Sequence, residues 1–292
     1  MMKITVFTPT YNRGYLLDKL YESLLKQTNT DFEWLIIDDG SNDNTSNIIN
    51  KFIDDDKIRI RYFYQENCGK HRAINKGLDI AEGELFFIVD SDDTLIPTAI
   101  EIVLEKYKSV ENYPEFAGIS FNRGYSEKEI VGKTFSSEFI DCTNLERGKK
   151  NILGDKSEIY RTEILRNIKF PEIEGENFMS EIVLWNEVAR QGYKLRWYNE
   201  IIYICNYLED GLTVNRDSIY LRNPIAHKMM VNELLQIDFP IKSKVNTIYN
   251  YYKLWRDKKS FIEISKDINI NKFILVISIV IGLVKSKIRR RK

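Results

Sequence analysis

The regular alternation of short apolar strands with amphipathic helices over the first 110 residues limits this chain to the α/β class. Strands are expected at residues 3–8, 33–37, 58–64 and 84–89. Helices are expected at residues 15–27, 73–81 and 97–107, and Asp43 is expected to cap a further one. Because strands that are joined through helices run in one direction, the sequence predicts a mostly parallel sheet flanked by helices.

The second half of the chain has a less regular pattern. A strand is expected at 116–121, a helix at 178–190 and another strand at 194–207. Residues 122–150 are polar and rich in turns, and the chain is helical and aromatic from about Pro224 onward. The total of 292 residues fits one large α/β domain, or such a domain with a small appendage.

Charge and cysteine content exclude several classes of protein. The 43 Lys and Arg residues balance 43 Asp and Glu residues, which excludes a strongly basic body that would coat nucleic acid. Cys68, Cys142 and Cys205 form no CxxC pair, so we expect neither a disulfide framework nor a cysteine-based zinc site. The sparse cysteines, the short apolar start and the lack of an apolar run of about 20 residues lead us to expect a cytoplasmic protein.

Paired acids follow two of the four predicted strands. One strand ends in DDGS at residues 38–41, and another ends in DSDD at residues 90–93. Ligands of open α/β sheets bind outside the carboxyl ends of the strands, where both pairs are expected. Clustered carboxylates repel one another unless a cation is bound, and their hard oxygen atoms suit Mg²⁺ or Mn²⁺. The alternative is an acidic loop that only faces solvent.

Two classes of enzyme place an Asp-x-Asp motif after such a strand. In phosphatases of the haloacid dehalogenase type, four apolar residues precede Asp-x-Asp-x-Thr, and the first Asp is a covalent nucleophile. Residues 86–94 match that pattern. In metal-dependent sugar-nucleotide transferases, the motif holds a divalent ion that bridges the diphosphate of the donor. The phosphatase motif opens the first strand of its domain, whereas about 85 residues of α/β pattern precede it here.

The motifs upstream favour the transferase. They are TPTYNR at 8–13, IDDGS at 37–41, NxGK at 67–70 and AEGE at 81–84. In this order the set resembles the inverting family 2 glycosyltransferases, strongly over residues 3–108 and weakly over residues 109–215. The resemblance implies the GT-A fold, a Rossmann-like, mostly parallel sheet flanked by helices, with an irregular acceptor-side half and a helical C-terminus.

The same resemblance divides the chain into three parts. It implies a half that binds the nucleotide sugar at 1–110 and a half that binds the acceptor and carries the catalytic base at 111–222. The helical C-terminal region would then occupy residues 223–292.

The resemblance also implies roles for single residues. Thr8, Pro9, Thr10 and Tyr11 would lie against the base and ribose of the donor. Asp39 would accept the N3–H of a uracil or thymine. Asp92 would contact a Mn²⁺ or Mg²⁺ ion directly, and Asp90 would bind the ribose or a metal-bound water. Lys70, and also Arg72, would reach a phosphate. The alternative role for Asp39 is to cap a turn, and the alternative for Lys70 is a side chain that only faces solvent.

An inverting transferase needs a carboxylate that deprotonates the acceptor hydroxyl opposite the leaving diphosphate. The family places Glu-Asp at the start of a helix about 90 residues after the Asp-x-Asp motif, and this chain has Ser180-Glu181 there. Glu181 is therefore the expected base, with Ser180 as the helix cap. Glu176 and Glu187 are its rivals.

Residues 273–292 join an apolar stretch to a basic end. Eleven of the twelve residues 273–284 are apolar, and six cations with no acid follow at 285–292. The stretch is too short to span about 30 Å of hydrocarbon. We therefore expect a shallow anchor whose cations meet anionic lipid at the inner face of the cell membrane. A core helix with a frayed end is the alternative.

The resemblance thus implies a metal-dependent inverting glycosyltransferase. It would move a sugar from a nucleoside diphosphate donor, expected to be a UDP-sugar, onto a hydroxyl of a glycan or lipid-linked acceptor, as in cell-surface polysaccharide assembly. A phosphatase of the haloacid dehalogenase type is one alternative. A catalytically silent module that binds nucleotide sugars is the other.

Overall fold

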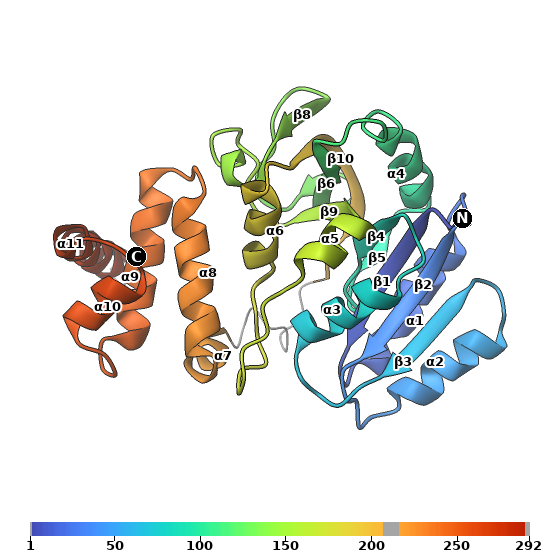
Figure 1. The fold of residues 1–292 in the computed structure, drawn as a ribbon, viewed down its shortest axis with the longest axis horizontal. Helices are drawn as coiled ribbons and strands as arrows, with labels where there is room; N and C mark the ends of the chain where they lie inside the picture. The colour runs from blue at the N-terminus through green and yellow to red at the C-terminus, as the bar shows by residue number, and fades with distance from the viewer. Residues whose placement is uncertain (1, 207–215, 290–292) are drawn as a thin grey trace.

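The computed structural model describes residues 2–206 and 216–289 of the chain (Figure 1). Its strands are β1 (Ile4–Thr10), β2 (Phe32–Asp38), β3 (Ile60–Tyr64), β4 (Leu85–Ile88), β5 (Thr94–Leu95), β6 (Phe116–Ser126), β7 (Glu129–Ile130), β8 (Phe139–Cys142), β9 (Lys156–Arg161) and β10 (Lys194–Ile204). Its helices are α1 (Gly14–Leu25), α2 (Thr45–Asp54), α3 (Lys70–Ile80), α4 (Ala99–Tyr107), α5 (Thr162–Ile168), α6 (Glu181–Arg190), α7 (Arg216–Arg222), α8 (Pro224–Gln236), α9 (Ile241–Trp255), α10 (Phe261–Asp267) and α11 (Lys272–Arg289), and a 3₁₀ turn, η1, spans Asn144–Glu146.

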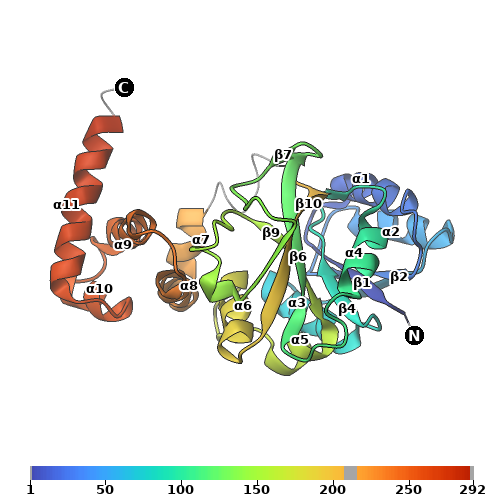
Figure 2. The ribbon, with the colours of Figure 1, turned by 90° about the horizontal axis from the view of Figure 1, so that it is seen from above.

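The strands form one sheet in the order β3-β2-β1-β4-β9-β6-β10-β5, with β7 paired to β6 and β8 paired to β10. The four strands of the first half, β3, β2, β1 and β4, run parallel as the sequence predicts. β9 pairs antiparallel with both β4 and β6, and so joins the parallel half to the mixed second half. Helices cover both faces of this sheet (Figure 2), which confirms the predicted α/β class.

The sequence pattern does not predict β9, which lies between the two halves of the sheet. Its residues read KSEIYR, yet Lys156 and Ser157 are both buried. The Lys156 ammonium donates to Asn122 Oδ1 at 2.9 Å and to the Lys133 carbonyl at 3.0 Å, so its burial is compensated. Pairing with strands distant in sequence therefore outweighs a local composition that is typical of a surface segment.

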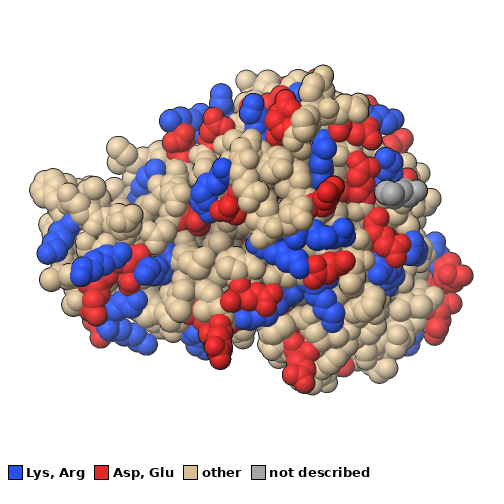
Figure 3. All heavy atoms as spheres, viewed as in Figure 1, with Lys and Arg blue, Asp and Glu red and all other residues tan. Residues whose placement is uncertain are grey.

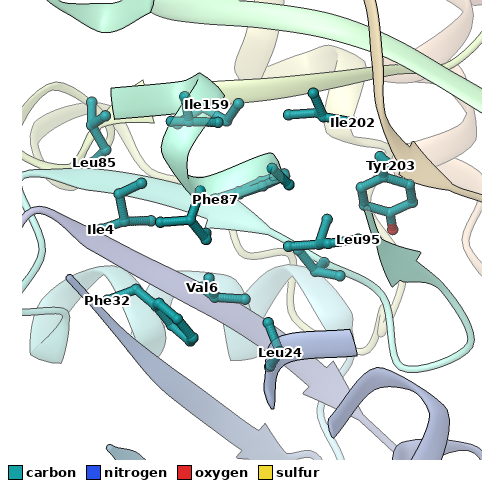
Figure 4. Close-up of a cluster of buried hydrophobic side chains, with 14 of the residues drawn as sticks. Ile4, Val6, Leu24, Phe32, Leu85, Phe87, Leu95, Ile159, Ile202 and Tyr203 are labelled. Carbon is teal, nitrogen blue, oxygen red and sulfur yellow. The ribbon is translucent and has the colours of Figure 1, made fainter. Parts of the chain in front are cut away.

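The buried strands feed two separate cores because successive side chains point to opposite faces of the sheet. Helices α1, α2 and α4 cover one face, where Val6, Leu24 and Phe87 belong to a single buried cluster (Figure 4). Helices α3, α5 and α6 cover the other face, where Phe7 and Leu184 belong to a second cluster. Burial on both faces explains why these strands read as continuous apolar runs.

The structure moves two predicted boundaries near the candidate site. β1 continues to Thr10, so residues 8–10 lie inside the strand and not in a turn after it. α3 begins at Lys70 instead of residue 73 and follows Gly69, whose φ is 104°. A Cβ at Gly69 would overlap the carbonyl group of Asn177, so both the backbone and the close approach require glycine there. Lys70 therefore lies in the first turn of a helix.

Helices α7 to α11 follow the sheet and complete the helical C-terminus. Trp255, Ile264 and Leu275 belong to a third buried cluster formed by α8 to α11. Figure 2 shows α11 at the end of the molecule farthest from α1 and α2. Among the described residues, no single helix is both long and apolar enough to cross a membrane. The pair Phe261–Asp267 and Lys272–Ser286 passes that test only together, with a bend of 103° between the two helices.

One side of α11 packs and the rest is open. Leu275 and Ser278 are buried, and Gly282 lies against the ring of Tyr249. The large apolar side chains that α11 exposes are Phe273, Ile274, Val276, Ile277, Val280, Ile281, Leu283 and Val284. The helix is therefore a packed element that also carries an exposed apolar face. Of the six predicted tail cations, those at 290–292 lie outside the described residues.

Candidate active site

The predicted donor motifs meet where the parallel strands β1, β2 and β4 end. In the segment 8–11, Thr8 is buried and its hydroxyl accepts the indole N–H of Trp34 at 2.9 Å. The Thr10 hydroxyl is buried and has no hydrogen-bond partner among the described residues. Tyr11 is 46% exposed, whereas Pro9 is buried. The tyrosine is therefore the side chain of this segment that a ligand can reach directly.

Asp38, the first acid after β2, bonds to the protein itself. Its Oδ1 accepts the amide N–H of Ser41 at 2.8 Å, and its Oδ2 accepts the hydroxyl of Tyr62 at 2.9 Å. Asp38 is buried, so both bonds are sheltered from water. Asp38 therefore caps the turn and leaves Asp39 for a different task.

Asp39, the second acid after β2, shapes the loop that leads into α3. Its Oδ1 accepts the amide of the Gln65 side chain at 2.7 Å and the backbone N–H of Cys68 at 3.0 Å. Its Oδ2 accepts the N–H of Gly69 at 2.8 Å and the side-chain amide of Asn67 at 3.3 Å. These four donors occupy the acceptor positions that a carboxylate offers.

Both carboxylates of the Asp-x-Asp motif pair with cations from other parts of the chain. Lys70 Nζ is 2.6 Å from Asp90 Oδ1, and Arg13 Nη1 is 2.8 Å from Asp92 Oδ2. Arg123 Nη1 lies 3.6 Å from the other oxygen of Asp90. Burial raises the pKa of Asp90, but Lys70 and Arg123 outweigh this effect and lower the pKa to about 2. The two carboxylates are therefore paired with cationic side chains of the chain itself.

Asp93, the third acid of this loop, lies inside it. The Tyr203 hydroxyl donates to Asp93 Oδ2 at 2.6 Å and accepts the N–H of Asp90 at 3.0 Å. The N–H of Asn206 donates to the other oxygen of Asp93 at 2.8 Å. Burial, followed by the charge of Asp90, raises the pKa of Asp93 to about 6. Asp93 thus joins the acidic loop to the end of β10 and does not face outward.

Glu181, the predicted base, lies at the start of α6 and reaches the same place. Ser180 occupies the N-cap position as expected, although its hydroxyl makes no capping hydrogen bond. Glu181 Oε1 is 2.8 Å from Lys70 Nζ, and both side chains are 31% exposed. Lys70 therefore lies between Glu181 and Asp90, and so connects the two halves of the predicted site.

The two rival glutamates are engaged elsewhere. Glu176 is buried, and its two oxygens accept the N–H groups of Ile225 and Ala226, each at 2.8 Å, at the start of α8. Glu187 pairs with Arg190 on the surface of α6 at 2.9 Å. Glu181 is thus the one of the three that contacts the residues around the Asp-x-Asp motif.

Arg72 fastens the segment that precedes α6 to the loop before α3. Its guanidinium donates to the carbonyl oxygens of Cys68, Ile173 and Glu176, each at 2.7 Å. These bonds occupy Arg72 and hold the backbone on both sides of the site. His71 beside it is buried, and burial lowers the pKa of His71 to about 4.

The donor set fits a divalent ion that is shared with a substrate. Among residues 2–206 and 216–289, no three Asp, Glu, His or Cys side chains form a complete metal site. Asp90 and Asp92 supply two hard carboxylates, and a Mg²⁺ ion is commonly bound by one or two carboxylates together with phosphate oxygens and water. Lys and Arg are mixed with Asp and Glu over the face seen in Figure 3. Two carboxylates beside Lys70 and Arg13 are the residue types that such a shared ion and its phosphate ligand need.

Three residues that complete the site were missing from the sequence interpretation. Arg13 belongs to the TPTYNR motif, which could have suggested it. Arg123 lies on β6 and Tyr203 lies on β10, and neither belongs to a motif of the sequence. No local signal marks these two, because only the pairing of β6 with β10 brings them to the acidic loop.

Residues 5–168 match the model of glycosyl transferase family 2, which is more than half of the chain. The chain therefore belongs to glycosyl transferase family 2 and is an inverting glycosyltransferase.

Two relatives illustrate the range of similarity. A GalNAc(5)-diNAcBac-PP-undecaprenol beta-1,3-glucosyltransferase of Campylobacter jejuni is 29% identical over 268 residues, which cover 87% of this chain and 82% of the relative. Glycosyltransferase GlyG of Streptococcus pneumoniae is 40% identical over 142 residues, which cover 46% of each chain. The similarity to GlyG is thus higher but extends over less than half of its length.

Solved structures confirm the GT-A fold. TarS of S. aureus in complex with UDP matches with a TM-score of 0.60 and 20% identity, over 90% of this chain and 75% of TarS 1–349. The mannosyltransferase PcManGT from Pyrobaculum calidifontis, in complex with GDP-Man and Mn²⁺, matches with a TM-score of 0.55 and 14% identity. That match covers 97% of this chain and 75% of the mannosyltransferase.

Proposed function

We propose that this enzyme transfers a sugar from a UDP-sugar to a hydroxyl group of a glycan or lipid-linked acceptor. The observation that carries the proposal is the position of Lys70, 2.6 Å from Asp90 and 2.8 Å from Glu181. It brings a donor-side acid and a candidate base into one site. The name of the Campylobacter jejuni relative includes an undecaprenol-linked glycan, and TarS has been solved with UDP and UDP-GlcNAc, which supports this choice of substrates.

Residues 1–110 are proposed to bind the donor, with the segment 8–11 against the base and ribose. Asp39 reads the uracil edge by accepting its N3–H. Because four donors already occupy this carboxylate, one of them must be displaced, and the exposed side chain of Asn67, whose bond of 3.3 Å is the longest of the four, is the donor that we propose to move. The backbone N–H groups of Cys68 and Gly69 stay bonded, so the loop before α3 keeps its shape.

Asp92 and Asp90 would hold the Mn²⁺ or Mg²⁺ ion. When bound, the ion supplies positive charge to the diphosphate as it leaves. Arg13 and Lys70, which pair with these carboxylates, are placed to donate N–H groups to the phosphate oxygens. The four side chains thus form the part of the site that stabilises the leaving group.

Glu181 is proposed to act as the general base from the acceptor half, residues 111–222. Its carboxylate takes the proton of the acceptor hydroxyl, and the hydroxyl oxygen forms a bond to the anomeric carbon of the sugar. The bond between that carbon and the diphosphate oxygen breaks, and its electron pair leaves with UDP. Attack from the side opposite the diphosphate inverts the anomeric configuration.

The exposed apolar face of α11 is proposed to contact the membrane that carries a lipid-linked acceptor. Phe273 is 70% exposed and Val280 is 55% exposed, which is costly in water and favourable at the boundary of lipid headgroups and acyl chains. The cations that begin at Lys285 would meet anionic headgroups. The proposed location is therefore the inner face of the cell membrane.

A donor screen tests this function. The protein is incubated with Mn²⁺ and a panel of UDP-, GDP- and dTDP-sugars, and the released nucleoside diphosphate is measured. Release that is confined to UDP-sugars supports the proposal. Release of phosphate from a monoester, with an aspartyl-phosphate trapped at Asp90, would replace it with the phosphatase alternative. Binding of a UDP-sugar without any turnover would indicate a silent module.

A further inference from the structure

Arg123 brings a guanidinium from the acceptor half into the candidate active site. It lies on β6, and in the parallel pairing of β6 with β10 its register partner is Tyr203. The guanidinium carbon lies 4.2 Å from the centre of the Tyr203 ring, which is fully buried. The hydroxyl of the same tyrosine is hydrogen-bonded to Asp90 and Asp93. Arg123 therefore stacks on the residue that holds the acidic loop in place.

The position of this guanidinium is fixed before any substrate binds. Its Nε donates to the carbonyl oxygen of Lys156 on β9 at 2.9 Å. One face is covered by the Tyr203 ring, and the side chain is only 13% exposed. An arginine held at Nε and stacked on an aromatic ring loses little further rotamer freedom when it binds a ligand.

The Nη atoms of Arg123, in contrast, remain available. Within the described residues they make no hydrogen bond, and the nearest carboxylate oxygen, Asp90 Oδ2, is 3.6 Å away. Buried polar groups in folded proteins are almost always hydrogen-bonded. A rigid, mostly buried guanidinium whose Nη atoms make one long ion pair and no hydrogen bond to the described residues therefore points to a ligand that carries oxygen acceptors.

We propose that Arg123 binds the hydroxyl oxygens of the transferred sugar and so contributes to the choice of donor. The proposal rests on the function proposed above. In an inverting displacement, the sugar must lie between the diphosphate, held near Asp90 and Asp92, and the base Glu181. Arg123 approaches from the acceptor half at Asp90, the acid that Lys70 links to Glu181. The sugar ring is the part of the substrate expected at that position.

The other oxygen-bearing groups are matched by other cations. The diphosphate would meet Arg13, which pairs with Asp92, and Lys70, which pairs with Asp90. Each of these two cations lies within 3 Å of its carboxylate. Arg123 makes no contact of that kind, since its distance to Asp90 exceeds that of a hydrogen bond. We therefore assign the sugar, and not the phosphate, to this side chain.

The test compares Arg123→Lys and Arg123→Gln with the wild type. With Mn²⁺ present, the dissociation constants of UDP, UDP-GlcNAc and UDP-glucose are measured by calorimetry. We expect UDP binding to change by less than about 2-fold, while kcat/KM for the sugar that is turned over falls by about 10- to 100-fold. UDP-sugars that lack one ring hydroxyl are then used as donors. A hydroxyl whose removal impairs the wild type, but not Arg123→Lys, identifies the contact.

Arg196→Lys is the matched control, because Arg196 also stacks on an aromatic ring, that of Phe139 at 4.2 Å, but pairs with Asp141 outside the site. Thermal unfolding of each variant shows whether it folds. An equal loss of UDP and UDP-sugar binding would assign Arg123 to the phosphate, and a change confined to the KM of the acceptor would assign it to the acceptor. Either result, or no coupling with any deoxy donor, overturns the inference. If the wild type turns over no nucleotide sugar, the proposed function itself fails.

Discussion

The ammonium group of Lys70 lies 2.8 Å from the carboxylate of Glu181, although 111 positions separate the two residues in the sequence. Lys70 begins α3 in the proposed donor half, and Glu181 begins α6 in the proposed acceptor half. Burial lowers the pKa of Lys70, but Asp90 and Glu181 outweigh burial and raise it. A cation that is held charged between two carboxylates is well placed to be drawn toward an incoming diphosphate, which would leave Glu181 free to accept a proton.

Lys70→Met removes this cation while keeping most of the side-chain volume. We expect kcat/KM for the nucleotide sugar to fall by about 10- to 100-fold, because a hydrogen bond to a charged phosphate oxygen is lost. The affinity for UDP in the presence of Mn²⁺ should fall as well. Lys76→Met is the control, since Lys76 lies on the same helix and donates to the Tyr64 carbonyl, away from the site. Equal kinetics for both variants would remove Lys70 from the mechanism.

Asp92→Asn tests the divalent ion. If Asp92 is a metal ligand, the variant should lose turnover, and its affinity for UDP should no longer respond to Mn²⁺. Asp79→Asn serves as the control, because Asp79 pairs with Lys169 on the outer side of α3. A loss of UDP affinity that is the same with and without Mn²⁺ would show that Asp92 is not a ligand.

The exposed face of α11 allows membrane binding to be tested without disturbing the fold. Deleting the whole segment 273–292, as the sequence alone would suggest, would also uncover the packing surface of Leu275 and Gly282. The triple substitution Phe273→Ser, Val280→Ser and Val284→Ser changes exposed side chains only. We expect it to weaken binding to vesicles of phosphatidylglycerol and phosphatidylcholine while leaving the melting temperature unchanged.

Replacing the cations at 285–292 with Gln separates the electrostatic contribution to vesicle binding from the apolar contribution of α11. Each cation near an anionic surface contributes about 1 kcal/mol, and this share should fade as salt rises because the Debye length shrinks. A wild-type protein that ignores such vesicles at low salt would contradict the membrane proposal.

Stability should depend on pH through the two histidines of the chain. Burial lowers the pKa of His71 and of His227 to about 4, whereas a histidine in the unfolded chain titrates near 6.5. Between these values the unfolded state binds more protons, so the free energy of unfolding falls as the pH drops from about 6.5 to about 4. This contribution to stability is fully present above about pH 6.5.

The variant His227→Phe measures how much one of the two histidines contributes to the pH dependence of the free energy of unfolding. His227 Nδ1 accepts the indole N–H of Trp255 at 3.0 Å, so the variant should be less stable above pH 6.5, where the histidine of the wild type is neutral. Its free energy of unfolding, measured in urea at several pH values, should nevertheless fall less steeply below pH 6.5 than that of the wild type. Identical slopes would mean that His227 is not held neutral in the folded protein.

The parallel half of the fold could be predicted because its signals are local. The apolar runs of β1, β2 and β4, the helices between them and the acids at the strand ends follow from neighbouring residues. These features depend on periodicity and on the topology of parallel sheets. Glu181 is singled out by the family resemblance, which implies an acid at the start of a helix at that spacing after the Asp-x-Asp motif.

The rest of the site depends on contacts between distant segments. Lys156 is polar, and its burial in β9 is possible only because Asn122 and a backbone carbonyl receive its ammonium. Arg123 and Tyr203 reach the acidic loop through strand pairing that no local pattern records. The four hydrogen bonds to Asp39 come from a loop almost 30 residues further on, so the turn motif alone could not reveal them.

Glu181→Gln is the most direct test of the proposed mechanism, since it keeps the shape of the side chain and removes the proton acceptor. With a UDP-sugar that the wild type turns over, Mn²⁺ and an acceptor, the single-turnover rate is measured beside the control Glu187→Gln. We predict that the rate falls by about 10²- to 10⁴-fold, while the dissociation constant of UDP hardly changes and the control matches the wild type. A Glu181→Gln enzyme with a near wild-type rate would contradict the assignment of Glu181 as the base.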